Sequence, residues 1–167
     1  MLQDEVLSNE DTMEQRKCLD AIRPVYAHLV KILVRKSQLP SEQSIDKWNS
    51  DDLETFRCYR QDIADTLLFC YDVLNDRILA ILAETLDEGI AAIQADISSW
   101  PKLEASIHAF CAISQQVDTA EYLEIVKLMR VLNEIPYETM NEKLLGTALE
   151  TMGENLLNEF KLLEYPT

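Results

Sequence analysis

The sequence predicts an all-α fold of about six amphipathic helices. The chain has 167 residues, about the length of one ordinary domain, and 47% of them are hydrophobic, so it can bury a sizeable core. Glycine occurs only 3 times and proline 5 times, which leaves few positions for tight turns or glycine-rich phosphate loops. Apolar residues recur three and four positions apart along most of the chain, and this period favours helices over strands.

The first helix is expected to begin at a capping box formed by Thr12 and Gln15. Its apolar stripe continues until Leu39, where Pro40 ends the helical run. Pro24 lies inside this helix and is expected to kink or divide it, because proline removes a backbone donor and crowds the preceding turn. The stripe consists of Leu19, Ile22, Tyr26, Leu29 and Leu33.

A loop over residues 41–50, carrying Trp48, is expected to separate the first helix from the second. Asn49 is a suitable N-cap for the second helix, because its side-chain oxygen can accept bonds from first-turn backbone N–H groups. Asn75 and Asp76 then interrupt the apolar pattern and mark the boundary with a third helix. The two stripes are Phe56, Tyr59, Ile63, Leu67, Cys70 and Leu74, then Ile78, Leu82, Leu86, Ile90 and Ile93.

Three further helix starts follow. Pro101 is expected in the first turn of a fourth helix, where its missing N–H costs little. Capping boxes formed by Asp118 with Glu121 and by Thr139 with Glu142 predict a fifth and a sixth helix. Short links between consecutive helices suit either an up-and-down bundle or a stack of antiparallel helix pairs, and the apolar pattern leaves both open.

The charge balance restricts the classes of partner. Lys and Arg number 15 against 30 Asp and Glu, which gives a formal net charge of -15. Such a field repels phosphate backbones and anionic lipid headgroups, so we expect neither nucleic acid nor membrane as a partner. The acidic surface is suited either to attracting basic proteins or simply to keeping a helical protein in solution.

The four cysteines predict neither a zinc site nor a disulfide framework. Cys18, Cys58, Cys70 and Cys111 lie in helical patterns, and none stands two or three residues from another as a zinc knuckle requires. We expect them to be buried, reduced thiols. The acidic N-terminus lacks the layout of a signal peptide, and with the absence of a long apolar run this indicates a cytosolic or nuclear compartment.

The best enzyme hypothesis is a carboxylate metal site in a helical bundle, using Asp62 with Asp65 and Glu104 with His108. A di-iron bundle needs two Glu-x-x-His motifs, whereas Glu104 and His108 are four apart and His28 has no carboxylate at that spacing. A cysteine nucleophile would lack a third group to orient its base. The sequence therefore predicts no catalytic residue, no metal and no cofactor.

Residues 48–67, WNSDDLETFRCYRQDIADTL, carry the most specific motif of the chain. A tryptophan precedes a short polar and acidic stretch, and the helix that follows carries a phenylalanine, a Tyr-Arg pair and two aspartates. Their order and spacing resemble the importin-13 and transportin-3 group of nuclear transport receptors. The resemblance covers most of residues 1–152, is strongest at 48–67 and fades after Met152. The motif residues are Trp48, Phe56, Tyr59, Arg60, Asp62 and Asp65.

This resemblance implies that residues 1–167 form one HEAT-repeat segment of a longer solenoid, in which antiparallel helix pairs stack as a superhelix. The helices near residues 13–38, 75–95 and 120–134 would line its concave inner face, and the other three its outer face. A chain of this family that stops here would be a truncated part of the receptor.

The resemblance also implies a function without catalysis. Receptors of this group bind protein cargo and carry it through the nuclear pore under the control of the Ran GTPase, shuttling between cytoplasm and nucleus. Their partners are cargo, nuclear pore proteins and Ran in its GTP form, which would be gripped mainly by repeats outside this chain. A HEAT scaffold unrelated to transport is the alternative. On the implied inner helices, the candidate partner contacts are Asp76, Glu84, Asp87, Glu121, Tyr122 and Glu124, although solvated acidic helix faces are also common.

Arg60 has two possible roles, a partner contact or a clamp between helices. The clamp is favoured, because the planar guanidinium can hold a carboxylate at two points. Asp62 or Asp65 of the same helix, or an acid on a neighbouring helix, could supply that carboxylate. Trp48 is expected to be packed against the protein rather than to bind a ligand.

Overall fold

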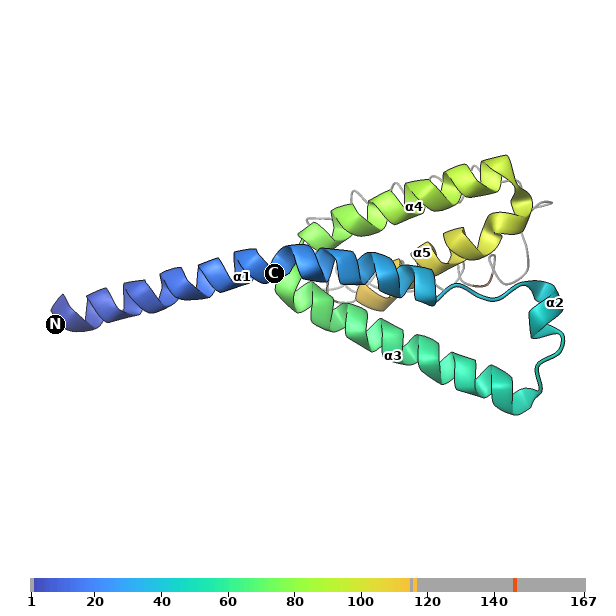
Figure 1. The fold of residues 1–167 in the computed structure, drawn as a ribbon, viewed down its shortest axis with the longest axis horizontal. Helices are drawn as coiled ribbons and strands as arrows, with labels where there is room; N and C mark the ends of the chain where they lie inside the picture. The colour runs from blue at the N-terminus through green and yellow to red at the C-terminus, as the bar shows by residue number, and fades with distance from the viewer. Residues whose placement is uncertain (1, 115, 117–145, 147–167) are drawn as a thin grey trace, which may run out of the picture.

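The computed structural model describes residues 2–114 together with residues 116 and 146. Within these residues the secondary structure is helical and contains no strand, so the all-α prediction is confirmed (Figure 1). The helices expected after Asp118 and Thr139 lie outside the described residues. The elements are α1 (Leu2–Lys36), α2 (Glu42–Ile45), α3 (Ser50–Leu74), α4 (Arg77–Ala95), the 3-10 helix η1 (Ile97–Ser99) and α5 (Trp100–Ile113).

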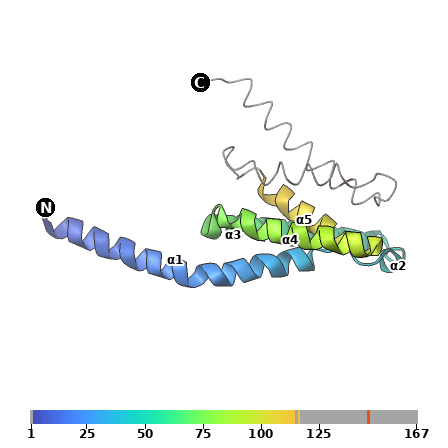
Figure 2. The same cartoon turned by 90° about the horizontal axis from the view of Figure 1, so that it is seen from above.

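The first helix is longer than the sequence analysis predicts. It begins at Leu2 rather than at the capping box of Thr12, so the predicted start is wrong. The residues before Thr12 include neither glycine nor proline, so no residue there interrupts the helix. Pro24 lies inside α1 and does not divide it, and Figure 2 shows that this helix bends near the middle of its length.

The connection from α1 to α3 contains a single helical turn, α2, where the sequence analysis expects only a loop. Asn49 then caps α3 as predicted. Its Oδ1 accepts hydrogen bonds from the backbone N–H groups of Asp51 at 2.8 Å and Asp52 at 3.0 Å. The Asp52 carboxylate in turn accepts from the Asn49 N–H at 3.1 Å, which completes a capping box.

The turn between α3 and α4 falls at the predicted boundary. Asn75 has a φ of 47°, in the left-handed region that asparagine tolerates better than most residues, and its N–H donates to the Tyr71 carbonyl at 2.7 Å. The chain therefore reverses direction within two residues. Figure 1 shows α3 and α4 spreading apart from this turn.

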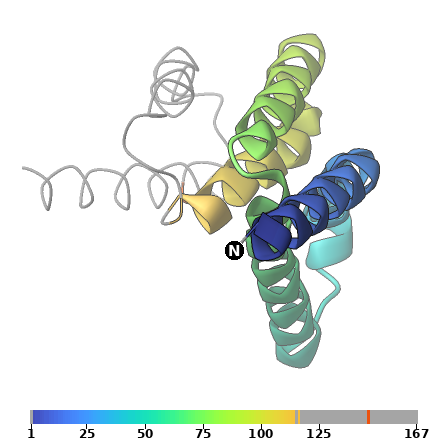
Figure 3. The same ribbon diagram turned by 90° about the vertical axis from the view of Figure 1, so that its left-hand side faces the viewer.

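The four long helices form two layers. Consecutive helices run antiparallel, so α1 and α4 point the same way in one layer while α3 and α5 point the opposite way in the other (Figures 1 and 3). We call these the α1–α4 layer and the α3–α5 layer. The core between them is built from side chains of all four helices: Val30, Val34, Ile63, Leu67, Cys70, Leu74, Ile78, Leu82, Leu103, Ile107, Phe110 and Ile113.

The two layers approach each other closely at Gly89 of α4. A Cβ at this position would lie 2.9 Å from the Leu103 Cα of α5, inside any real contact distance. The missing side chain therefore allows α4 and α5 to pack backbone against backbone. None of the described helices is long and apolar enough to cross a membrane.

Candidate protein-interaction surface

An ion pair joins the two helices of the α3–α5 layer. Arg60 Nη2 of α3 donates to Glu104 Oε1 of α5 at 2.8 Å, with side-chain exposures of 13% and 1%. Asp62 and Asp65 are both exposed, and Asp65 instead accepts a hydrogen bond from Gln61 at 3.0 Å. Of the two roles considered for Arg60, the structure therefore contains the inter-helix clamp. The sequence leaves open which acid of a neighbouring helix is the partner, because only the fold brings positions 60 and 104 together.

His108 lies one turn after Glu104 on α5 and is mostly buried. Burial, together with the positive charge of Arg60, lowers the pKa of His108 from 6.5 to about 4. The imidazole is therefore neutral near pH 7. Within the described residues, no group of three or more His, Cys, Asp and Glu side chains is arranged to hold a metal ion.

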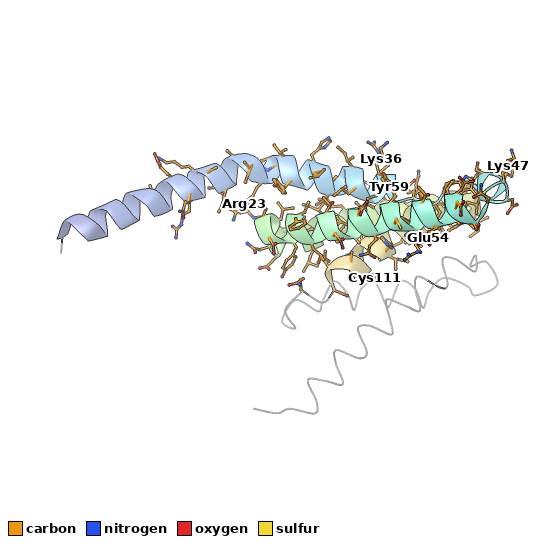
Figure 4. All side chains as sticks on the ribbon, turned by 90° about the horizontal axis from the view of Figure 1, so that it is seen from below. Arg23, Lys36, Lys47, Glu54, Tyr59 and Cys111 are labelled. Carbon is orange, nitrogen blue, oxygen red and sulfur yellow. The ribbon has the colours of Figure 1, made fainter. Side chains whose placement is uncertain are left out.

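The aromatic residues of the family motif pack against one another where α3 begins. The ring centroids of Trp48 and Phe56 are 5.3 Å apart, and those of Phe56 and Tyr59 are 6.0 Å apart. These distances and the tilted ring planes are typical of favourable aromatic pairs. Trp48 is thus packed against α3, and Tyr59 keeps 40% of its surface exposed (Figure 4).

The cysteine expectation is wrong for two of the four positions. Cys70 is buried, and burial raises the pKa of its thiol to about 11. Cys111 is half-buried on α5. Cys18 and Cys58 are exposed, because they lie on the sides of α1 and α3 that face away from the core. No disulfide joins any of the four.

The acidic candidates of the sequence analysis divide into two groups. Asp76, Glu84 and Asp87 are exposed in the α1–α4 layer. Glu84 Oε2 accepts a hydrogen bond from Lys31 Nζ of α1 at 2.6 Å, and this bond raises the pKa of Lys31. The carboxylate of Glu84 is therefore paired with a cation of the same layer. The remaining candidates lie outside the described residues: Glu121, Tyr122 and Glu124.

A groove of about 300 Å³ opens between α1, α4 and α5, with Lys31, Arg35 and Lys102 on its walls. None of these three residues is among the candidates predicted from the sequence. One signal for them exists, since Lys31 and Arg35 stand one helical turn apart on the same face in a chain with twice as many acids as bases. The third cation, Lys102, lies on a helix far away in sequence, so only the folded structure shows that it lines the same groove.

The helices form antiparallel pairs that stack in two layers. Each helix contacts its neighbours in sequence and the helix of the adjacent pair that runs in the same direction. This arrangement defines a HEAT-type helical repeat protein. The family described as "Importin 13 repeat" matches residues 38–77, which include the whole motif at 48–67. The structure is similar to a solved chain described as "Importin13 cytosolic state", with a TM-score of 0.81 and 59% identity, covering 92% of this chain and 17% of that one.

Curated relatives give the same result. The chain is 34% identical over 153 residues to importin-13 from Gallus gallus and from Homo sapiens, covering 91% of this chain. It is 24% identical over 111 residues to "Importin-13 homolog A" of Dictyostelium discoideum. The chain matches a segment of importin-13. It spans 15% of the length of the vertebrate relatives and 10% of the Dictyostelium one.

Proposed function

We propose that this chain is part of a nuclear transport receptor, a karyopherin that binds protein cargo and carries it through the nuclear pore under the control of Ran. The observation that carries this proposal is the likeness to importin-13 over 92% of the chain, with 59% identity and a TM-score of 0.81. The function is binding rather than catalysis and needs no cofactor. The chain works in the cytoplasm and the nucleus.

The partners follow from the same likeness. They are protein cargo, nuclear pore proteins and the GTP form of Ran, with most Ran contacts made by repeats outside this chain. Nucleic acid and membrane lipids are not partners, because the net charge of -15 repels their phosphate groups. Residues 1–167 act as one HEAT-repeat segment of a longer solenoid.

The α1–α4 layer is the face that we propose for cargo. Asp76 and Asp87 of this layer are exposed, and Glu84 keeps 62% of its side-chain surface exposed despite its bond to Lys31. Exposed carboxylates on one face favour a basic patch on a partner and speed the encounter with it. Glu121, Tyr122 and Glu124, which lie outside the described residues, remain candidate contacts for the same cargo.

The coupling between Ran and cargo would act through curvature. In a solenoid each helix pair contacts only its neighbours, so small rotations at successive interfaces add to a large change of shape. The Arg60–Glu104 ion pair joins neighbouring helices of the α3–α5 layer and would hold the two at a defined spacing. A partner bound to the α1–α4 layer can then be bound or released as the curvature of the solenoid changes.

The first experiment compares proteins retained from cell extract by the full-length receptor, with and without Ran locked in its GTP form. The transport proposal expects the retained set to change when Ran-GTP is added. A HEAT scaffold unrelated to transport would retain the same set in both conditions. Ran locked in its GDP form is the matched control, and an equal response to the two nucleotide forms would contradict the proposal.

A second experiment tests the cargo face. The variant Asp76→Lys with Asp87→Lys reverses two charges of the α1–α4 layer, and Asp62→Lys with Asp65→Lys reverses two exposed charges of α3. Retention of basic cargo should fall severalfold in the first variant and stay unchanged in the second. Equal loss in both variants would indicate a general charge effect and would remove the assignment of this face.

A further inference from the structure

The groove between α1, α4 and α5 differs in charge from the rest of the chain. Lys31, Arg35 and Lys102 line it together with a single acid, Glu88. Elsewhere acids outnumber bases, since the whole chain holds 30 acids and 15 bases. The groove is therefore a basic site on an acidic protein, and clefts concentrate the field of the charges that line them.

Two of the three cations remain available to a ligand. Lys31 is bonded to Glu84, whereas Arg35 and Lys102 form no ion pair with any residue that the structure describes. Both side chains are exposed. The groove also includes the half-buried amide of Gln38, which can donate two hydrogen bonds.

The position of Lys102 is not explained by the stability of its helix. It lies in the first turn of α5, and that turn contains no acidic residue. The N-terminus of a helix carries a partial positive charge, so a cation there is unfavourable for the stability of the helix. The same partial charge adds to the field of the lysine at the mouth of the groove.

The groove, with a volume of about 300 Å³, has room for a short segment of extended chain. Ser106 lies on its wall, and its hydroxyl is turned away into hydrogen bonds with the Thr85 and Lys102 carbonyls at 3.0 and 3.1 Å. Besides the Lys31–Glu84 pair, the charged and amide groups on the wall are thus the cationic ends of Arg35 and Lys102, the Gln38 amide and the one carboxylate of Glu88.

We propose that this groove binds an extended acidic segment of a protein partner, with carboxylates held by Arg35 and Lys102. The inference rests on the proposed function and adds a second kind of ionic contact to it. The acidic residues of a cargo would bind the groove, and its basic residues would bind Asp76 and Asp87. A peptide with a few carboxylates matches a site of this size. A long nucleic acid would extend over the surrounding surface, where the net charge of -15 repels it.

The test is a fluorescence-anisotropy titration of the chain with a short labelled polyglutamate peptide, at low and at moderate salt. The variant Arg35→Glu with Lys102→Glu should weaken peptide binding about tenfold or more, because it replaces two attractions by two repulsions. The control variant Lys17→Glu with Lys47→Glu carries the same net charge and alters exposed lysines that do not line the groove, and it should bind as the parent does. Circular dichroism checks that all three proteins are equally helical.

Three results would overturn the proposal. They are no binding of the peptide, equal weakening in both variants, and tighter groove-dependent binding of a single-stranded oligonucleotide than of the peptide. Failure here is distinct from failure of the transport proposal. If the receptor responds to Ran but the groove does not bind the peptide, only the proposal for the groove is contradicted. If the groove binds the peptide but the receptor does not respond to Ran, only the transport proposal is contradicted.

Discussion

Arg60 Nη2 lies 2.8 Å from Glu104 Oε1, and the pair ties α3 to α5 with the carboxylate side chain only 1% exposed. Removing two charges from water is costly, so an ion pair of this kind adds less to stability than its short distance suggests. The main effect of the pair is to fix the position of α3 relative to α5. A helix rotated away from this position would leave a charge buried without its partner.

The first prediction is that breaking this pair is more harmful than replacing it. Arg60→Met should lower the free energy of unfolding by about 3 kcal/mol, because it removes the cation that pairs with the buried Glu104 carboxylate. Glu104→Leu should cost less, because Arg60 is 13% exposed and can reach water. The double variant should regain most of the loss. Urea unfolding of the four proteins gives the double-mutant cycle, and additive losses would contradict this account.

The second prediction concerns His108, whose pKa is lowered to about 4. Between pH 6.5 and 4 the unfolded chain takes up a proton that the folded chain refuses. The free energy of unfolding therefore falls as the pH drops through this window, by about 1–3 kcal/mol from this residue. His108→Gln should remove that part of the pH dependence. Urea unfolding at both ends of the window measures it, and identical slopes in parent and variant would exclude the effect.

The sequence predicts the local structure of the described region well, because its signals are local. Asn49 caps α3 through atoms within three residues of itself, so its role can be predicted from the residue type and the pattern that follows. Thr12 has the same kind of signal and fails, because a capping box can also occur inside a longer helix when no breaker precedes it.

The site depends on contacts that sequence spacing does not contain. Glu104 follows Arg60 by 44 residues and Glu84 follows Lys31 by 53. Acids occur throughout this chain, so only the packing of the layers selects these two as partners. The burial of cysteines is hard to predict for a related reason, since Cys58 and Cys70 share one helix but face opposite environments.

The third prediction contrasts the exposed ion pair with the buried one. Lys31 and Glu84 approach to 2.6 Å, but their side chains are 44% and 62% exposed. Water and salt screen such a pair, so Glu84→Gln should change the free energy of unfolding by no more than about 0.5 kcal/mol. The small effect should vanish in high salt. A loss comparable to that of Arg60→Met would show that the pair is less screened than its exposure indicates.

The fourth prediction tests the cap of α3. Asn49→Ala removes the acceptor of two backbone N–H groups and should cost about 1 kcal/mol. Asn49→Gly is the matched control, because glycine allows water to reach those N–H groups and should cost only a few tenths of a kcal/mol. Thermal unfolding compares the two variants with the parent. If Asn49→Ala melts at the same temperature as the parent, the side-chain cap contributes little to the stability of this helix.

The fifth prediction concerns the contact between α4 and α5. Gly89→Ala would place a methyl group 2.9 Å from the Leu103 Cα and 3.1 Å from its backbone nitrogen. Neither atom belongs to a flexible side chain, so the helices must move apart. Alanine is the better helix former by about 1 kcal/mol, but the strain of overpacking is about 1–3 kcal/mol, and the variant should be less stable than the parent. A separation of α4 from α5 would also widen the basic groove beside them.

Gly146→Ala is the control, since a methyl group there meets no atom of the described residues within 4 Å and should stabilise through helix propensity alone. Urea unfolding should therefore give opposite signs for the two glycine substitutions, and a stabilised Gly89→Ala would mean that the two helices separate at little cost.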